Sequence, residues 1–154
     1  PVTANFAPYL LERAQIYMNN DQARNAMLDY DAYYKAVNGQ VNALFYYYRE
    51  QAALKARQYQ RALDDIVKAV ELSPKDLTYR AEHAVVNLRV GRYEESMKIL
   101  NEILKDEPKY GEAYRLLGLC QIQLKKTDEA CGNFNKAKEL GDPNVDELIK
   151  KYCK

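Results

Sequence analysis

The sequence has no tryptophan, a single histidine and only three cysteines among its 154 residues. It also lacks an apolar run of the roughly 20 residues that a helix needs to cross a bilayer, so no membrane span is predicted. The first residues, 1–5, have neither the basic start nor the apolar middle of a signal peptide. These absences favour a soluble chain. Since His83 stands alone, a histidine-based metal cluster is excluded, and we expect it to be a half-buried structural residue.

An excess of either charge is also missing, because 23 Lys and Arg residues balance 22 Asp and Glu residues at a net charge of +1. This balance argues against a nucleic-acid partner, which usually requires a basic surface. The glycines are scattered and form no phosphate-binding loop, and carboxylate pairs such as Asp64-Asp65 and Glu94-Glu95 suit solvated helix faces. With no nucleophile and base to combine, we predict that the chain is not an enzyme and holds no cofactor or metal.

The cysteines, Cys120, Cys131 and Cys153, are too few and too unevenly placed for a disulfide framework. Their spacing contains no CxxC motif, which argues against zinc. We therefore expect reduced, packed thiols. One disulfide and one free thiol is the alternative in an oxidising compartment.

What the sequence does contain is an internal repeat. A shift of 34 residues aligns Ala62 with Ser96 and Ala130, and it places Pro74 on Pro108. The same shift aligns Ala69 with Ile103 and Ala137, and Tyr46 with Arg80 and Tyr114. Small, apolar and proline positions thus return together, and a period of this length indicates a stacked repeat architecture.

Each period has the pattern of two helices. In the last period, Tyr114, Leu117 and Gln121 follow helical spacing up to a polar turn at 125–127. Acidic residues then open a second helix, whose apolar face contains Ala130, Phe134 and Ala137. Gly141 and Pro143 end this helix, because glycine permits a left-handed cap and proline lacks an N–H donor.

The repeated residues resemble those of the tetratricopeptide repeat family over nearly the whole chain. The matching positions of the three clearest periods are Tyr46, Tyr59, Ala62, Ile66, Ala69 and Pro74, then Ala84, Gly91, Tyr93, Leu100 and Pro108, then Tyr114, Leu117, Gly118, Ala130, Phe134 and Ala137. The resemblance implies an all-α, right-handed superhelix of four helical hairpins and a C-terminal capping helix. The predicted repeats are 7–42, 43–76, 77–110 and 111–143, with the capping helix at 144–153, in a single array over 1–154.

The two ends of the array differ. At the carboxyl end, an amphipathic segment follows Pro143, with Asn144 as its expected N-cap and an apolar side that would cover the last hairpin. The tail resembles those of bacterial members of the family, which favours an exported or periplasmic parent protein. The amino end has no initiator Met and no polar cap, so we expect a piece of a longer parent and consider self-association through this edge.

Small residues at Ala14, Ala84 and Gly118 predict close approach of the two helices in each hairpin. The second hairpin has Glu50 at this position, which we interpret as a local ion pair with Arg13 or Arg49, because an unpaired buried charge is very costly.

The resemblance also implies a binding surface, because first helices line the concave face in this family. It predicts contact with a peptide or partner helix through Tyr47, Gln51, Leu54, Lys55, Ala81, Val85, Leu88, Arg89, Arg115, Leu119 and Ile122, preceded by Leu11, Gln15 and Met18. The apolar middle and the cationic edges suit a partner with apolar anchors and some acidic character. The alternative is that neighbouring helices or missing repeats cover part of this strip.

Family members that clamp the terminal carboxylate of chaperone tails use Lys, Asn and Arg on this face. The matching positions here hold Leu11, Gln15, Tyr47, Gln51 and Ala81, so chaperone-tail binding is not predicted.

The sequence therefore predicts a protein–protein interaction scaffold whose partner it does not identify. A structural spacer or self-association module within a larger protein is the alternative, and an accessory domain of an enzyme is the weaker one.

Overall fold

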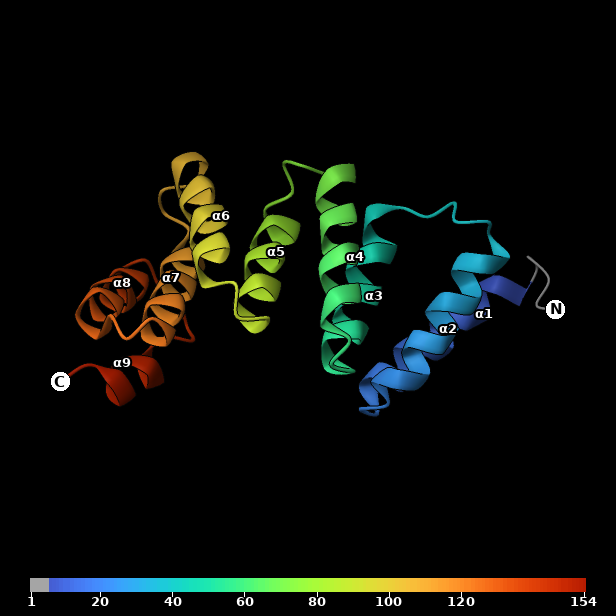
Figure 1. The fold of residues 1–154 in the computed structure, drawn as a ribbon, viewed down its shortest axis with the longest axis horizontal. Helices are drawn as coiled ribbons and strands as arrows, with labels where there is room; N and C mark the ends of the chain where they lie inside the picture. Colours follow the sequence, from blue (N-terminus) through green and yellow to red (C-terminus); the bar gives the residue numbers. More distant parts are fainter. Residues whose placement is uncertain (1–5) are drawn as a thin grey trace. The chain divides into compact units, whose positions relative to one another are not determined.

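The computed structural model describes residues 6–154, and these residues form α-helices and connecting turns with no strand (Figure 1). Eight helices pair as four hairpins, which confirms the all-α prediction. The hairpins are α1 (Ala7–Asn19) with α2 (Ala23–Ala36), α3 (Ala43–Lys55) with α4 (Tyr59–Leu72), α5 (Leu77–Arg89) with α6 (Tyr93–Asp106), and α7 (Gly111–Gln123) with α8 (Thr127–Glu139). A short helix, α9 (Asp146–Tyr152), follows the last hairpin.

Helix starts follow local side-chain chemistry. Asn42 caps α3 by accepting a hydrogen bond from the Phe45 N–H at 3.0 Å. Asp76 caps α5 in the same way, with the Thr78 N–H at 2.9 Å. The second, third and fourth hairpins begin at Ala43, Leu77 and Gly111, the residues at which the predicted repeats begin.

The turn inside each hairpin uses a left-handed residue at one repeated position. These residues are Asp21, Arg57, Gly91 and Lys125, with φ values of 56°, 61°, 82° and 60°. Glycine adopts this conformation without strain, whereas a side chain there costs conformational energy. Glycine occupies the position only in the third hairpin, so packing of the two helices holds the turn elsewhere.

Close helix pairing depends on the small residues of the repeat. Ala14 and Ala84 on first helices, and Ala26, Ala62 and Ala130 on second helices, are fully buried. In the third hairpin, Ser96 donates a hydrogen bond from Oγ to the Ala84 carbonyl at 2.7 Å, which satisfies its buried hydroxyl. The predicted role of these positions in close packing is therefore met.

The chain divides into two compact units, Pro1–Lys75 (unit 1) and Asp76–Lys154 (unit 2). Unit 1 contains the first two hairpins, and α3 packs against α2. Unit 2 contains the other two hairpins and α9, and α7 packs against α6. Each unit is therefore a pair of stacked hairpins with its own core.

The carboxyl end corrects two predictions. Helix α9 begins at Asp146 rather than 144, and its N-cap residue is Val145 and not Asn144. The Asn144 N–H donates a hydrogen bond to the Asp142 carboxylate at 2.7 Å. The expectation of reduced thiols is wrong for two cysteines, since Cys131 of α8 and Cys153 beyond α9 form a disulfide. The predicted covering role holds, because Val145 is buried with the core of the last hairpin.

Candidate functional site

The predicted binding residues of unit 1 lie on α3. Tyr47, Gln51 and Leu54 are half-buried, and Lys55 is exposed. The Lys55 ammonium lies 2.8 Å from the Asp21 carboxylate, and its hydrogen bond lowers the pKa of that carboxyl. The cation that was expected to attract an acidic partner therefore already has an anionic neighbour.

On α5, the predicted residues of unit 2 are less accessible than their pattern indicates. Ala81 is only 4% exposed, and Val85 and Leu88 pack against the hydrophobic core of the unit. Arg89, by contrast, is exposed at the end of the helix. Partial coverage by neighbouring helices thus applies to the apolar part of this helix.

On α7, the remaining predicted residues also take part in the unit's own packing. The Arg115 guanidinium bonds Asp142 at 2.9 Å and Glu112 at 3.0 Å, and its side chain is 15% exposed. Leu119 and Ile122 pack against the core that contains Phe134. These residues stabilise the last hairpin whether or not they also contact a partner.

A hollow beside two first helices lies in unit 1, between α1 and α3, with α2 next to it. Its volume is about 600 Å³, within the size range of ligand pockets. It is lined by Leu11 and Gln15 of α1, Tyr30 and Tyr33 of α2, Gln40, Val41 and Asn42 of the connection, and Leu44, Phe45 and Tyr48 of α3. We call it the unit 1 pocket.

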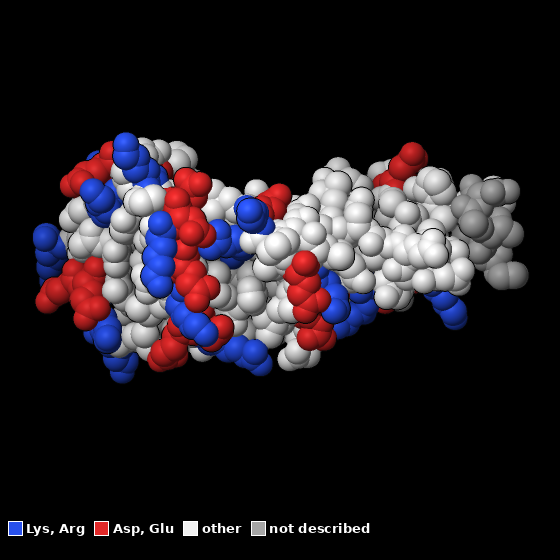
Figure 2. Space-filling model, turned by 90° about the horizontal axis from the view of Figure 1, so that it is seen from above, with Lys and Arg blue, Asp and Glu red and all other residues white. Residues whose placement is uncertain are grey.

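The unit 1 pocket has no charged side chain in its lining. Burial raises the pKa of Tyr30 to about 12, so its phenol stays neutral at physiological pH. On the face shown in Figure 2, charged side chains gather over unit 2, and most of the unit 1 surface is uncharged. Apolar contact with a few hydroxyl and amide groups is therefore the chemistry that this pocket offers.

Leu11 and Gln15 were predicted from the family's helical phase, but the pocket uses Leu44 and Tyr48 of α3 in place of Tyr47 and Gln51. Leu44 is 44% exposed although it lines the pocket. An adjacent residue on a helix points about 100° away, so a one-residue change in phase selects a different strip of side chains. The sequence alone does not set this phase, because it depends on how α3 packs against α2.

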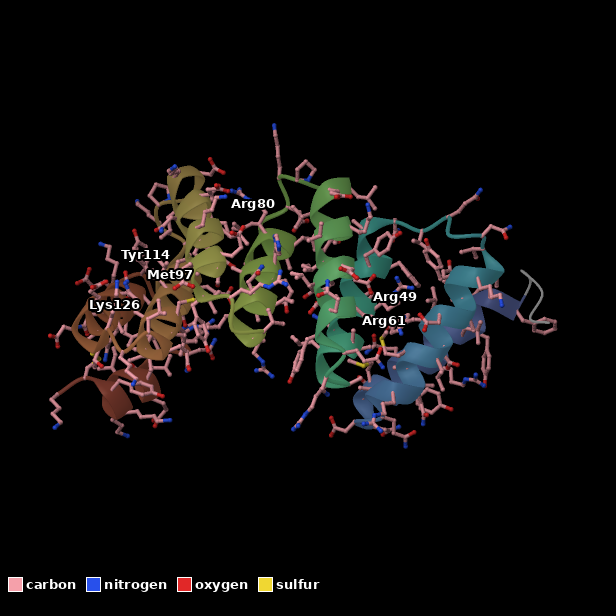
Figure 3. All side chains as sticks on the ribbon, viewed as in Figure 1. Arg49, Arg61, Arg80, Met97, Tyr114 and Lys126 are labelled. Atoms are coloured by element: carbon pink, nitrogen blue, oxygen red, sulfur yellow. A yellow bond between two sulfur atoms is a disulfide. The ribbon has the colours of Figure 1, made fainter. Side chains whose placement is uncertain are left out.

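An ion-pair network supports the aromatic wall of the pocket. The Arg49 guanidinium makes two hydrogen bonds to Asp65, at 2.8 and 2.7 Å, and also pairs with Asp31, which accepts a bond from Arg61 (Figure 3). The same guanidinium lies 5.2 Å from the centroid of the Phe45 ring, a cation–π distance. Burial raises the pKa of the Asp65 carboxyl, and the bonds from Arg49 oppose that rise.

Sequence reasoning missed these pairs. Arg13 bonds Asp29 twice, at 2.7 Å each, in the same positions that Arg49 and Asp65 occupy one hairpin later. Both arginines thus have aspartate partners, whereas the prediction assigned one of them to Glu50, which is fully buried. The offset of 36 residues that aligns Ala26 with Ala62 also aligns both pairs, and it was the signal that could have found them.

Two further hollows lie beside α6 in unit 2. One, of about 710 Å³, is lined by Met97, Lys126 and both acidic and basic residues. The other, of about 570 Å³, contains Met97 and Tyr114, which Figure 3 labels together with Lys126. Acidic and basic side chains line the first hollow and Lys105 lines the second, whereas the unit 1 pocket has an uncharged lining.

The single histidine and the free cysteine are both removed from solvent, at least in part. Burial lowers the pKa of His83, which is half-buried as predicted, and raises the pKa of the buried Cys120 thiol. Over residues 6–154, no group of three or more His, Cys, Asp and Glu side chains is placed to hold a metal ion. Across the same residues, no helix has the length and apolar content that a bilayer crossing requires.

The sequence is similar to known tetratricopeptide repeat proteins over part of its length. The tetratricopeptide repeat family profile matches residues 53–116. Small glutamine-rich tetratricopeptide repeat-containing protein 2 of Mycosarcoma maydis is 29% identical over 99 residues, which cover 64% of this chain and 28% of that protein. Heat shock protein STI1 of Saccharomyces cerevisiae is 31% identical over 101 residues, which cover 63% of this chain and 17% of that protein. The chain thus spans under a third of the length of either relative.

Solved structures of similar fold extend over more of the chain. YrrB, described as a tetratricopeptide repeat protein with an unusual peptide-binding site, superimposes with a TM-score of 0.79 and 19% identity, covering 94% of this chain and 74% of YrrB. A thermophilic tetratricopeptide repeat protein of Thermus thermophilus, TTC0263, gives a TM-score of 0.72 and 17% identity, covering 94% of this chain and 82% of TTC0263. At these identities the likeness shows the fold alone, and that fold is the helical-repeat solenoid that the sequence pattern predicts.

Proposed function

The chain belongs to the tetratricopeptide repeat family, and from this premise we propose that it is an interaction scaffold whose first helices bind an apolar segment of a partner protein. The segment is an extended peptide or a helix that places an uncharged side chain in the unit 1 pocket. The proposal assigns the chain a binding role and no catalytic step.

The unit 1 pocket is the observation that carries this proposal. Its volume, its aromatic lining and the few polar groups beside that lining are the usual combination for an anchor side chain. Gln15, Gln40 and Asn42 supply amide donors and acceptors that can orient a peptide backbone at the rim. An ionic anchor would lose its hydration here and find no opposite charge.

The residues predicted on the concave face remain proposed contacts for the rest of the segment. In unit 2, exposed Arg89 suits an acidic residue of the partner. The neighbouring Val85 and Leu88 are half-buried, so a partner could contact only the part of each side chain that faces solvent. The proposed set is Tyr47, Gln51, Leu54, Lys55, Ala81, Val85, Leu88, Arg89, Arg115, Leu119 and Ile122.

One structural neighbour supports peptide binding in general, whereas this chain's own residues argue against a chaperone-tail partner. YrrB is described as having a peptide-binding site, and this chain shares its fold. The name of STI1 identifies a heat shock protein, but here Leu11, Gln15 and Tyr47 stand at positions where a clamp for a terminal carboxylate has Lys, Asn or Arg. A neutral apolar anchor fits these residues better.

We also infer that the protein works in an oxidising compartment. The Cys131–Cys153 disulfide supports this inference, because such bonds persist mainly outside the reducing cytosol. It agrees with the exported or periplasmic location that the carboxyl-terminal tail favours.

Selection from a phage library of random peptides tests the proposed binding role. We expect the selected peptides to share a large uncharged apolar residue and to bind the wild-type chain. Leu44→Glu places a charge in the pocket and should weaken binding at least about tenfold, since an unpaired charge in an apolar site is costly.

Leu28→Glu is the matched control, because Leu28 is another exposed leucine of unit 1 but does not line the pocket. This variant should bind the selected peptides like wild type. Failure to select any peptide, or equal loss of binding in both variants with intact helicity, would contradict the proposal.

A further inference from the structure

Helix α1 exposes an apolar face that its own hairpin does not use. Tyr9 is 58% exposed and Ile16 is 57% exposed, and both lie on one side of the helix with Glu12 between them. Phe6, directly before the helix, is exposed as well. Among the described residues, the strongly exposed large apolar side chains all belong to unit 1. The exposed face of α1 is therefore one part of an apolar surface that unit 2 does not share.

The positions equivalent to Tyr9 and Ile16 are buried on α3 and α7. On α3 they hold Phe45 and Ala52, which are buried, and Phe45 packs its ring against Tyr30 and Tyr33 of the preceding helix, α2. On α7 they hold Ala113 and Cys120, and the Cys120 Sγ lies 3.4 Å from Ser96 of α6. On α3 and α7 this face therefore receives the preceding helix of the same unit, whereas on α1 Tyr9 and Ile16 are exposed.

The open face is separate from the unit 1 pocket. At 100° per residue, the Tyr9–Glu12–Ile16 side points roughly 110° away from the side of Leu11 and Gln15. The third side of α1, with Ala7, Leu10 and Ala14, is buried against its own hairpin. A helix on the open face would thus leave the proposed peptide site accessible.

The charges on the open face indicate which helix fits it. Glu12 stands at its centre, where α7 has the buried apolar Leu116, so a positive charge on a covering helix would offset the burial of this carboxylate. Arg13, beside it, is 40% exposed and uses two of its five N–H donors on Asp29. The Arg13 guanidinium also lies 5.5 Å from the centroid of the Tyr9 ring.

We propose that a second copy of this chain covers the open face, with the two α1 helices antiparallel. A two-fold axis between Glu12 and Arg13 places each Tyr9 on the partner's Ile16 and each Glu12 on the partner's Arg13. Both apolar contacts and both charge contacts are satisfied by the same operation, which is the self-complementarity that a two-fold dimer requires. The chain is then a dimeric scaffold that presents two copies of the unit 1 pocket.

Sedimentation velocity on the 154-residue chain tests the dimer over concentrations from about 1 to about 300 μM. We expect a concentration-dependent shift from monomer to dimer. Ile16→Glu, which puts like charges and an unmatched carboxylate in the face, should raise the dissociation constant at least about tenfold. Leu28→Glu, with its leucine 67% exposed on α2, should dimerise like wild type.

A cross-link tests the antiparallel geometry independently. With Cys120 buried and the other two cysteines bonded, Glu12→Cys adds a single exposed thiol close to the proposed axis. Mild oxidation should give a covalent dimer of Glu12→Cys and none of Leu28→Cys.

A chain that stays monomeric at every concentration, or a dimer that persists in Ile16→Glu, overturns the proposal. So does equal cross-linking of the two cysteine variants. Peptide binding by the monomeric Ile16→Glu variant would show that the peptide site does not require the dimer, so the two proposals are tested independently.

Discussion

At the scale of single residues, Gly118 shows how tightly a hairpin closes. A Cβ atom added to Gly118 of α7 would lie 2.6 Å from Cδ1 of Phe134 on α8. Phe134 is fully buried, so its ring has little space into which it can move. The glycine is therefore required by the facing helix and not by its own backbone conformation.

Gly118→Ala should lower the free energy of unfolding by about 1–3 kcal/mol, because overpacking forces a rotamer or backbone shift. Gly132→Ala is the matched control, since a Cβ at Gly132 on α8 would meet nothing within 4 Å. In that variant, alanine should raise the unfolding free energy by about 0.5–1 kcal/mol through its higher helix propensity. Urea unfolding followed by circular dichroism measures both values, and equal effects would contradict the packing explanation.

The buried ion pair of unit 1 makes a second residue-scale prediction. Arg49→Ala should cost about 3–5 kcal/mol of unfolding free energy, because it leaves the Asp65 carboxylate buried without its guanidinium. Arg61→Ala should cost only about 0–1 kcal/mol, since that side chain is 41% exposed and its ion pair is screened by solvent.

Combining Arg49→Met with Asp65→Leu should restore most of the stability lost in Arg49→Ala, because neither charge of this pair is then left buried alone. Thermal and urea unfolding of the three variants measure these differences. A double variant as unstable as Arg49→Ala would mean that packing and not charge burial sets the loss.

At the scale of helices, α9 is a seven-residue element that depends on other parts of unit 2. Isolated helices of this length are not stable in water. Val145 fixes its start in the core, and the Cys131–Cys153 disulfide ties its end to α8. The bond spans 22 residues of sequence, so it restricts the unfolded chain as well as the helix.

Reduction of this disulfide should lower the unfolding free energy by about 3 kcal/mol on the loop-entropy estimate. Urea unfolding with and without dithiothreitol measures the change, and Cys153→Ser should be insensitive to the reductant. In denaturant without reductant, thiol titration should find Cys120 alone. Three titrating thiols in freshly purified, unreduced protein would contradict the bond.

The sequence predicts the helices better than it predicts their lateral contacts. Helix starts such as Ala43 and Leu77 follow from local caps and from the repeat, which depend on residues close in sequence. The Arg13–Asp29 and Arg49–Asp65 pairs, the disulfide and the unit 1 pocket join residues from different helices. Their formation depends on helix tilt and rotation, which a single sequence fixes only weakly.

At the scale of the whole molecule, the two units differ in surface chemistry. The exposed large apolar side chains are in unit 1, whereas charged side chains are denser over unit 2 on the face shown in Figure 2. Exposed apolar surface beyond scattered residues usually marks an interaction site. This difference places both proposed interfaces, the unit 1 pocket and the open face of α1, in unit 1.

The central claim, that the unit 1 pocket holds the anchor of a partner segment, is tested most directly by methyl NMR. A selected peptide would be titrated into protein labelled at Leu and Val methyl groups. We predict that the largest shift changes occur at Leu11, Val41 and Leu44, which line the pocket, with little change at the exposed Leu28 and Leu72, which belong neither to the pocket nor to the proposed contact set. Changes confined to Leu88 and Leu119, or no saturable change at any methyl group, would contradict the claim.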